Sequence, residues 1–384
     1  MLYRLRVKAS RLKSYYVYDR ISVRPDKTQN NDGIVIVLHE AEYGGAPILG
    51  LKIGDELKKQ GKNIHYIVLR NGPLIQEISR VSSVSVVRSI KHARLELRKA
   101  FAVGYKTAIC NSVCTGALCE YGKKIGFHVV SLIHELPDLI QRMDLKRESK
   151  LMSFFSDCIV FPSNFVKQSF EARVCKVETR TIVQHQGIYT KGCSLSKEEA
   201  KKIVADEYGF SESKSLFLNV ASVDERKGFD IFVDLASKDV DSIYIWVGSG
   251  DEEFYQKTCR NHGGIPRNMY MPGYVKDMEK LAVLYRAADV FTLTSREEPF
   301  GTVVLEAFLN ETPVIAFEGR GGYVDVVKDG ETGCLVKYDD VDGYLENMHK
   351  LIFDSNRYDN CKKNCLLVAK NSDFKKYCQI ISSC

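Results

Sequence analysis

Short apolar runs alternate along the chain with longer segments in which apolar residues recur every three or four positions. In the first half the runs are almost continuously apolar, which is typical of parallel strands buried on both faces. They predict strands at residues 33–39, 63–69, 107–111, 127–133 and 157–161. Helices are predicted between them, among them one at 46–60 and one at 88–101. This alternation predicts an α/β fold.

The same pattern begins again after a polar stretch at residues 191–215. It predicts strands at 216–221, 243–247, 269–271, 289–294 and 313–317, and helices at 229–237, 252–262, 278–287 and 302–309. A restarted pattern favours two doubly wound, Rossmann-like domains rather than one large sheet. We expect the two domains to face each other across a cleft. We expect these domains at 32–195 and 196–369, after a basic extension at 1–31. A C-terminal helix within 370–384 is expected to pack back on one of the two domains, with the first domain as the candidate.

Charge is unevenly distributed between the two halves of the chain. Residues 1–190 carry 30 basic and 17 acidic side chains, whereas residues 191–384 carry 25 basic and 32 acidic ones. The first half is therefore the one expected to meet an anionic partner. Nucleic acid is not expected as that partner, because no nucleic-acid-binding motif is present.

The predicted helix at 88–101 is basic on one side and apolar on the other. Such a helix suits an anionic membrane surface, and it equally suits an ordinary solvated face. No window approaches 18 apolar residues, so no spanning helix is expected, nor is a secretory leader. The twelve cysteines form no C-x-x-C pair and have no zinc spacing, which favours reduced thiols in the cytosol.

The segment 295–308 carries the most informative chemistry. It follows a predicted strand, turns at Gly301 and enters a helix, so the backbone N–H groups of Gly301, Thr302 and Val303 face outward at the helix start. That arrangement favours an anion. Glu298 in the loop and Glu306 on the helix add two carboxylates that suit sugar hydroxyls.

Three further strand ends carry residues of related chemistry. Arg226 and Lys227 follow the strand at 216–221 and suit a diphosphate. Gly248 closes the strand at 243–247, and the glycines of 318–322 follow the strand at 313–317. Carboxyl ends of parallel strands share one edge of a sheet, where ligands of such folds bind.

Together these motifs resemble the family 4 retaining glycosyltransferases of the GT-B fold (glycosyltransferases group 1), in their bacterial polysaccharide-type branch. Glu298 and Glu306 match the E-x7-E motif, Arg226-Lys227-Gly228 matches the R/K-K-G element, and 329–336 matches a D-G-x-T-G-x-L-V element. The resemblance covers roughly residues 33–350. Two positions depart from it. Asp325 stands where the family usually has Glu, and Ala221-Ser222 stands where an Arg is common.

The resemblance implies roles for the matching residues. Glu298 would bind hydroxyls of the donor sugar together with the N–H groups of Phe300 and Gly301, and Glu306 would bind the ribose. Arg226 and Lys227 would bind the diphosphate. The remaining implied donor contacts lie at Gly248, Val275, Thr302 and Val303.

In the first domain, which the resemblance makes the acceptor side, two loops match a branch of the family. Gly44 and Gly45 lie in a loop expected near the donor phosphate. His134 lies in a cleft-lining loop and would contact the donor sugar or its phosphate. Arg70, at another strand end, is a weaker candidate that a surface turn would equally explain.

The resemblance implies transfer of a hexosyl unit from a nucleotide sugar to a saccharide or lipid-linked acceptor, in cell-surface polysaccharide or glycolipid assembly. No metal or other cofactor is expected. The D-x-D matches at 239–241 and 340–342 are interpreted as solvated turns.

Two other classes remain open. The main one is a catalytically silent GT-B subunit that supports a partner transferase, although the two glutamates, the Arg-Lys pair and the glycine loops argue against it. A dinucleotide oxidoreductase would use the G-x-G at 248–250, although position 253 is Glu and the full motif is missing.

The uneven charge fits a lipid-linked acceptor. Residues 1–28 alone hold eight basic groups against two acidic ones. We therefore expect a cytoplasmic protein, peripheral at the anionic inner face of the cell membrane.

Overall fold

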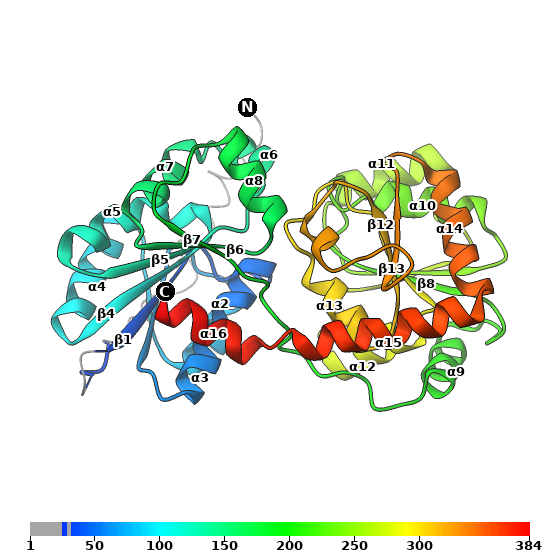
Figure 1. Cartoon of the computed structure of the whole chain (residues 1–384), viewed down its shortest axis with the longest axis horizontal. Coiled ribbons are helices and arrows are strands. Elements are labelled where there is room, and N and C mark those ends of the chain that lie inside the picture. Colours follow the sequence, from blue (N-terminus) through cyan, green and yellow to red (C-terminus); the bar gives the residue numbers. More distant parts are fainter. Residues whose placement is uncertain (1–24, 29–31) are drawn as a thin grey trace. The chain divides into compact units, whose positions relative to one another are not determined.

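The computed structural model describes residues 25–28 and 32–384. The basic extension predicted at 1–31 lies largely outside these residues. The chain forms two compact units (Figure 1). The first contains the described residues up to Pro162, residues 166–184 and Lys375–Cys384, and the second contains Ser163–Phe165 and His185–Phe374. From His185 to Phe374 the chain belongs to the second unit, which therefore begins earlier than the predicted boundary at 195/196.

The first unit is built on a parallel sheet of seven strands in the order β3-β2-β1-β4-β5-β6-β7. The strands are β1 (Gly33–Leu38), β2 (Ile64–Val68), β3 (Ser83–Val86), β4 (Tyr105–Asn111), β5 (His128–Leu132), β6 (Cys158–Phe161) and β7 (Arg180–Val183). Its helices are α2 (Gly45–Lys59), α3 (Ile75–Val81), α4 (Ile90–Ala102), α5 (Gly116–Ile125), α6 (Pro137–Arg142), α7 (Lys146–Phe155), α8 (Asn164–Arg173) and α16 (Phe374–Ser383), with a short 3-10 turn η1 (Val113–Thr115).

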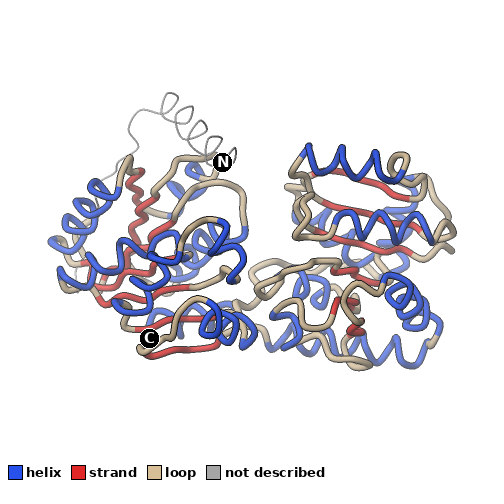
Figure 2. The backbone as a smooth tube through the Cα atoms, turned by 90° about the horizontal axis from the view of Figure 1, so that it is seen from above, coloured by secondary structure: helices blue, strands red, loops and turns tan. Residues whose placement is uncertain are grey.

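The second unit has a parallel sheet of six strands in the order β10-β9-β8-β11-β12-β13. The strands are β8 (Leu216–Val220), β9 (Ile243–Val247), β10 (Met269–Gly273), β11 (Val290–Leu293), β12 (Val314–Phe317) and β13 (Gly333–Val336). Its helices are α9 (Lys197–Tyr208), α10 (Phe229–Lys238), α11 (Glu252–His262), α12 (Met278–Ala287), α13 (Thr302–Leu309), α14 (Val341–Phe353) and α15 (Ser355–Asn371), with a 3-10 turn η2 (Gly322–Asp325). Figure 2 shows strands lying between layers of helices.

The core of the second unit has two parts, one on each face of the sheet. Residues of α9, α12 and α13 cover one face, and residues of α10 and α14 cover the other. Both faces of the strands are therefore buried, which explains their near-continuous apolar character. The predicted α/β class with two doubly wound sheets is confirmed.

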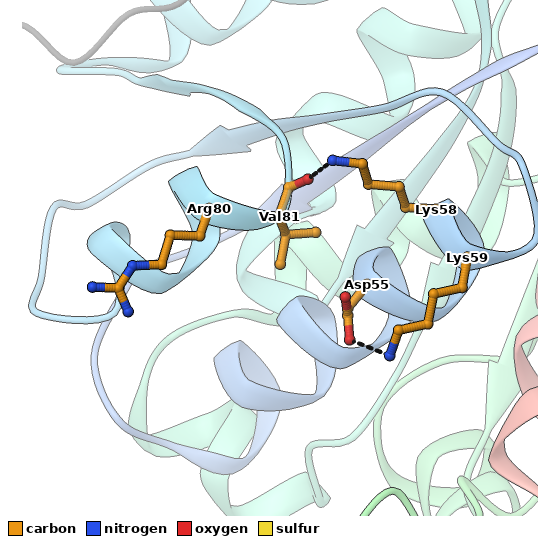
Figure 3. A pocket seen from close by; sticks show the side chains of 5 residues that line it. All are labelled: Asp55, Lys58, Lys59, Arg80 and Val81. Carbon is orange, nitrogen blue, oxygen red and sulfur yellow. Dashed lines mark hydrogen bonds and ion pairs between the residues drawn. The ribbon is translucent and has the colours of Figure 1, made fainter.

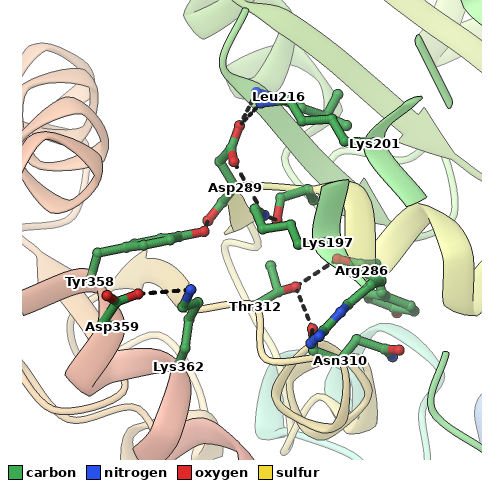
Figure 4. Close-up of polar contacts among 12 residues, drawn as sticks. Lys197, Lys201, Leu216, Arg286, Asp289, Asn310, Thr312, Tyr358, Asp359 and Lys362 are labelled. Atoms are coloured by element: carbon green, nitrogen blue, oxygen red, sulfur yellow. Dashed lines mark hydrogen bonds and ion pairs between the residues drawn. The ribbon is translucent and has the colours of Figure 1, made fainter. Parts of the chain in front are cut away.

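A buried charge network ties α9 and α15 to this sheet (Figure 4). Asp289 pairs with Lys197 at 3.2 Å and Lys201 at 2.9 Å, and it accepts a hydrogen bond from the Leu216 N–H at 2.8 Å. The hydroxyl of Tyr358 donates to the Asp289 carbonyl oxygen at 2.8 Å. Burial alone would raise the pKa of Asp289, but the two ammonium groups outweigh it and lower that pKa.

The helix α9 was not predicted, because it lies inside the polar stretch 191–215. It buries only Ala200, Val204 and Ala205, so its apolar periodicity is weak. Its N-terminus is a capping box, in which Ser196 and Glu199 each accept the other's backbone N–H. The short strands β3 and β7 were missed as well.

The C-terminal helix α16 belongs to the first unit. The Gln60 amide donates to the Lys375 carbonyl at 3.5 Å, and Nε2 of His128 lies 2.8 Å from the Cys384 carbonyl. The helix labelled α16 in Figure 1 thus completes a unit that begins with the first residues described.

Candidate functional site

The carboxyl ends of β8 and β11 bring Lys227 and Glu298 together in the second unit. The Lys227 ammonium pairs with Oε2 of Glu298, and only 15% and 8% of these side chains are exposed. The Ser295 hydroxyl donates to the same carboxylate oxygen at 3.4 Å. Burial lowers the pKa of Lys227, although Glu298 opposes that shift. The two opposite charges therefore form a largely buried ion pair at the edge of the sheet where β8 and β11 end.

The loop before α10 is held in a fixed shape around Lys227. Oδ1 of Asp224 accepts the Lys227 N–H at 2.8 Å, closing a tight turn. Gly228 follows with φ +71°, and a Cβ on it would lie 2.0 Å from the carbonyl oxygen of Thr294. Only glycine fits there, because it tolerates both the positive φ and the close approach.

The arginines of this region join three strand-end loops to one another. Arg226 donates from Nη1 to the Glu297 carbonyl at 3.0 Å. Arg296 forms a two-point ion pair with Asp230, both contacts at 2.7 Å, which raises the pKa of Arg296. Arg320 donates to the Arg296 carbonyl at 2.9 Å. These contacts fix the loops after β8, β11 and β12 relative to one another.

The start of α13 follows Glu298 directly. Gly301 has φ +79° and precedes the first helical residue, Thr302. Phe300 is buried and stacks on the ring of His185, with centroids 4.6 Å apart. The Pro299 carbonyl accepts from the Ser163 hydroxyl at 3.0 Å and from the Gly322 N–H at 3.2 Å. The loop carrying the predicted N–H donors is therefore held on several sides.

Glu306 lies in a different environment from Glu298. The hydroxyl of Tyr285 donates to Glu306 at 3.0 Å, and burial raises the pKa of Glu306 to about 7. Glu306 lines a small pocket together with residues of the α12 face and the segment before α9. The other lining residues are Thr190, Lys191, Met278, Leu281, Ala282, Tyr285 and Asn310. A hydroxyl-rich ligand entering here would meet a carboxylate that titrates near neutrality.

Gly248 has a packing reason to be glycine. Its φ is +138°, and a Cβ would lie 1.9 Å from the Ala221 carbonyl oxygen. A Cβ on Gly250 would likewise lie 2.4 Å from the Val223 carbonyl oxygen. Close packing therefore explains the G-x-G without a dinucleotide. Val275 lies half-buried between β10 and α12, and the donor contacts predicted for Gly248 and Val275 stay predictions.

In the first unit, His134 belongs to a chain of hydrogen bonds at the strand-end edge. Its Nε2 lies 2.8 Å from Oδ1 of Asn111, whose amide nitrogen donates to the Ala46 carbonyl at 2.6 Å. Since Oδ1 only accepts, Nε2 of His134 carries the proton. Burial lowers the pKa of His134, which favours the neutral ring. His134 is thereby connected to the start of α2, just after Gly44 and Gly45.

Other candidates of the first unit have structural partners. Arg70 forms an ion pair with Glu40, which favours the turn interpretation over a ligand contact. A surface pocket between α2 and α3 is lined by Asp55, Lys58, Lys59, Arg80 and Val81 (Figure 3). Lys59 pairs with Asp55 at 2.8 Å and Lys58 donates to the Val81 carbonyl, at the opposite end of α2 from Gly45.

The D-x-D segments differ from the prediction in one respect. Asp340 caps α14, and Asp342 in the first turn of that helix is 84% exposed beside Lys238, so this segment is solvated as expected but begins a helix. Asp239 is not solvated, because it accepts from Tyr244 at 2.9 Å and contacts Nε2 of His349 at 3.0 Å. Among the described residues, no cluster of three or more His, Cys, Asp or Glu side chains is arranged to hold a metal ion.

Sequence reasoning missed the residues that support the site from a distance. Ser163 and His185 lie far from 299–301 in the chain, and no local pattern marks them. Asn219 and Thr294, buried at the ends of β8 and β11, were missed for the same reason. In the sequence Asp325 is distinguished only as a departure from the family pattern. Its carboxylate contacts Nε2 of His185 at 3.3 Å.

Comparison with known proteins identifies the class. Residues 200–366 match the model of the family described as "Glycosyl transferases group 1". The match covers most of the second unit, and it confirms the resemblance to glycosyltransferases group 1 that the motifs of this unit carry. No described helix is both long and apolar enough to span a membrane.

Individual relatives are distant. The lipopolysaccharide core biosynthesis glycosyltransferase LpsE of Rhizobium meliloti is 25% identical over 207 residues, 53% of this chain and 57% of LpsE. The alpha-galactosylglucosyldiacylglycerol synthase of Streptococcus pneumoniae is 31% identical over 128 residues, 32% of this chain and 33% of the synthase. The matches thus span about half or less of these relatives.

Solved structures share the whole fold. HepE from Anabaena, described in complex with UDP and glucose, superposes with a TM-score of 0.78 at 18% identity. The match covers 92% of this chain and 98% of HepE. The sucrose-phosphate synthase of Thermosynechococcus elongatus gives a TM-score of 0.73 at 18% identity. These likenesses confirm the GT-B fold.

Proposed function

We propose that the chain is a retaining glycosyltransferase that moves a hexosyl unit from a nucleotide-sugar donor to an acceptor hydroxyl. The observation that carries this proposal is the buried pair of Lys227 and Glu298 beside the start of α13. A diphosphate entering there gains an ammonium group and outward backbone N–H groups, and a sugar gains a carboxylate. The family of the second unit and the UDP bound by HepE support a nucleotide-sugar donor.

The proposed reaction needs charge stabilisation at the leaving group. The bond from the anomeric carbon to the phosphate oxygen breaks while the acceptor oxygen bonds to the same face of that carbon. The leaving phosphate takes the proton of the acceptor hydroxyl. Arg226 and Lys227 offset the negative charge that develops, Glu298 orients the sugar and Glu306 holds the ribose. No metal ion is needed in this scheme, so we expect activity to persist in a chelator.

The test begins with a panel of nucleotide sugars, scored by thermal shift and then by product analysis. The purified protein should transfer sugar from at least one donor, and the anomeric configuration of the product, read by NMR, should equal that of the donor. Inversion would contradict the retaining assignment. Donor binding without turnover on any acceptor would support the catalytically silent subunit instead.

We also propose a role in cell-surface polysaccharide or glycolipid assembly, on the cytoplasmic side of a membrane. The relatives LpsE and the alpha-galactosylglucosyldiacylglycerol synthase support this class of acceptor. The helix α4 offers Lys91, Arg98 and Lys99 to solvent, whereas Ala93 and Leu97 are buried in the core. Because most of its apolar side is packed and Leu95 is its one large apolar side chain that is exposed, α4 would attract an anionic surface mainly by charge.

Flotation with liposomes tests the membrane proposal. We expect binding to vesicles that contain phosphatidylglycerol, weakened by salt and by the double substitution Lys91→Glu and Arg98→Glu. Deletion of residues 1–28 should weaken it further. Equal, negligible binding by all three proteins would contradict the proposal.

A further inference from the structure

A line of polar side chains runs through the apolar interior under Lys227. Asn219 on β8 and Thr294 after β11 are both fully buried. The Asn219 amide nitrogen donates to the Thr292 carbonyl at 2.6 Å and to Oγ1 of Thr294 at 3.1 Å. Oγ1 of Thr294 lies 3.1 Å from the Lys227 carbonyl oxygen. The line ends at the residue whose ammonium group pairs with Glu298.

The direction of these hydrogen bonds follows from chemistry. An amide nitrogen only donates, so the Thr294 hydroxyl must accept from Asn219. The hydroxyl has one proton, and the Lys227 carbonyl oxygen only accepts, so that proton goes to Lys227. Asn219 thus sets the orientation of the Thr294 hydroxyl, and Thr294 holds the Lys227 backbone.

Thr294 constrains the same loop at a second point. A Cβ on Gly228 would lie only 2.0 Å from the carbonyl oxygen of Thr294. The backbone of Lys227 and that of Gly228 therefore both contact Thr294, which directly follows the neighbouring strand β11. A shift at Thr294 would move the starting point of the Lys227 side chain.

We propose that Thr294, oriented by Asn219, is a positioning residue that holds Lys227 at the diphosphate of the donor. This inference rests on the proposed function, because it assigns Lys227 an anionic ligand. Loss of the Thr294 hydroxyl would leave the Lys227 carbonyl without this partner and free the loop to relax. A typical hydrogen bond contributes enough to change affinity roughly three- to tenfold.

Thr292, two positions before Thr294, provides a matched control. Thr292 lies on β11, is as fully buried as Thr294, and donates from Oγ1 to the Leu218 carbonyl at 3.1 Å. Its hydroxyl therefore serves the sheet and not the Lys227 loop. Thr292→Val and Thr294→Val remove the same group from the same environment, so general destabilisation affects both.

The single tryptophan provides a check on the loop. Trp246 pairs in register with Asn219 on the neighbouring strand. Its ring packs edge-on against Phe229, with centroids 5.1 Å apart, and Phe229 directly follows Gly228. Tryptophan emission therefore reports on the packing beneath the Lys227 loop.

The experiment measures binding of UDP, GDP and ADP by calorimetry and continues with the tightest of the three. Thr294→Val should weaken that binding roughly three- to tenfold and raise the donor KM more than it lowers kcat, whereas Thr294→Ser and Thr292→Val should bind like the wild type. Equal binding by Thr294→Val and the wild type, or equal weakening by Thr292→Val, would overturn the inference. If Thr294→Val does not keep native tryptophan emission, Thr294→Ala replaces it under the same criteria.

Lys227→Met separates the two proposals. If the wild type binds none of the three nucleotides, or if Lys227→Met binds as tightly as the wild type, the proposed function fails and the inference fails with it. If Lys227→Met loses binding while Thr294→Val keeps it, only the positioning role is refuted.

Discussion

Lys227 and Glu298 lie 71 residues apart in the chain and form a buried ion pair at the ends of neighbouring strands. Burying two charges costs desolvation energy, which the pair only partly recovers by mutual attraction. A protein that needed stability alone would do as well with apolar residues here. The pair is better explained by a ligand that one or both groups meet.

The first prediction separates stability from activity at this pair. Glu298→Gln leaves the Lys227 ammonium buried without its carboxylate and should lower the free energy of unfolding by about 3–5 kcal/mol. The double variant Lys227→Met with Glu298→Gln should recover most of that loss, yet remain inactive in transfer. Urea unfolding and a transfer assay measure the two quantities. A double variant that transferred sugar near the wild-type rate would refute the assigned roles.

The second prediction concerns Glu306 and pH. Its pKa of about 7 in the folded protein exceeds the ordinary value of 4.5, so its contribution to stability is full below pH 4.5 and is lost as the pH rises through 7. Glu306→Gln should therefore gain stability relative to the wild type between pH 5 and pH 7, by up to about 1.4 kcal/mol per pH unit, and the gain should level off at higher pH.

Nucleotide binding should respond to pH in the opposite sense at the same residue. The ionised carboxylate is the better acceptor for ribose hydroxyls, so wild-type affinity should rise from pH 6 to pH 8. Glu306→Gln should bind more weakly at pH 8 and lose most of this dependence. Parallel pH profiles for the two proteins would argue against ribose binding by Glu306.

The third prediction tests the close approach at Gly228. Gly228→Ala should destabilise the protein by clearly more than about 1–2 kcal/mol, the cost typical of a left-handed non-glycine residue, because the new Cβ meets the Thr294 carbonyl. Gly263 has φ +69° with no atom near its missing Cβ, so Gly263→Ala isolates the backbone term. Similar melting temperatures for the two variants would show that the loop yields easily.

The fourth prediction concerns the buried network around Asp289. Asp289→Asn leaves Lys197 and Lys201 without their carboxylate and should cost about 3–5 kcal/mol of stability. Because the pKa of Asp289 is lowered in the folded state, its contribution is present above the ordinary value of 3.8 and is lost as the pH falls below it. Asp342→Asn, at an exposed pair, is the control and should melt like the wild type.

Much of the fold could be predicted because its strands are buried on both faces. The helices at 252–262, 278–287 and 302–309 occur as expected, and the strand at 243–247 does too. The helix α9 escaped because tertiary contacts, and not a strong apolar stripe, hold it. Here the capping box at Ser196 was the available signal.

In the candidate site, too, residues marked by a local motif could be predicted, whereas residues placed by tertiary contacts could not. Lys227 and Glu298 sit in recognisable loop motifs, so their proximity followed from the fact that strand ends share an edge. Thr294 and Asn219 act through a contact across two strands, and a local sequence pattern does not encode which buried hydroxyl faces which carbonyl. His185 and Ser163 reach the loop at 299–301 from still farther along the chain.

The return of α16 to the first unit has a consequence for synthesis on the ribosome. Domains commonly fold from the N-terminus as they emerge. Here residues 375–384 are made after the entire second unit, so the first unit waits with the surface that receives α16 uncovered. Until residues 375–384 have left the ribosome, the buried side chains of that surface are open to chaperones and to other nascent chains.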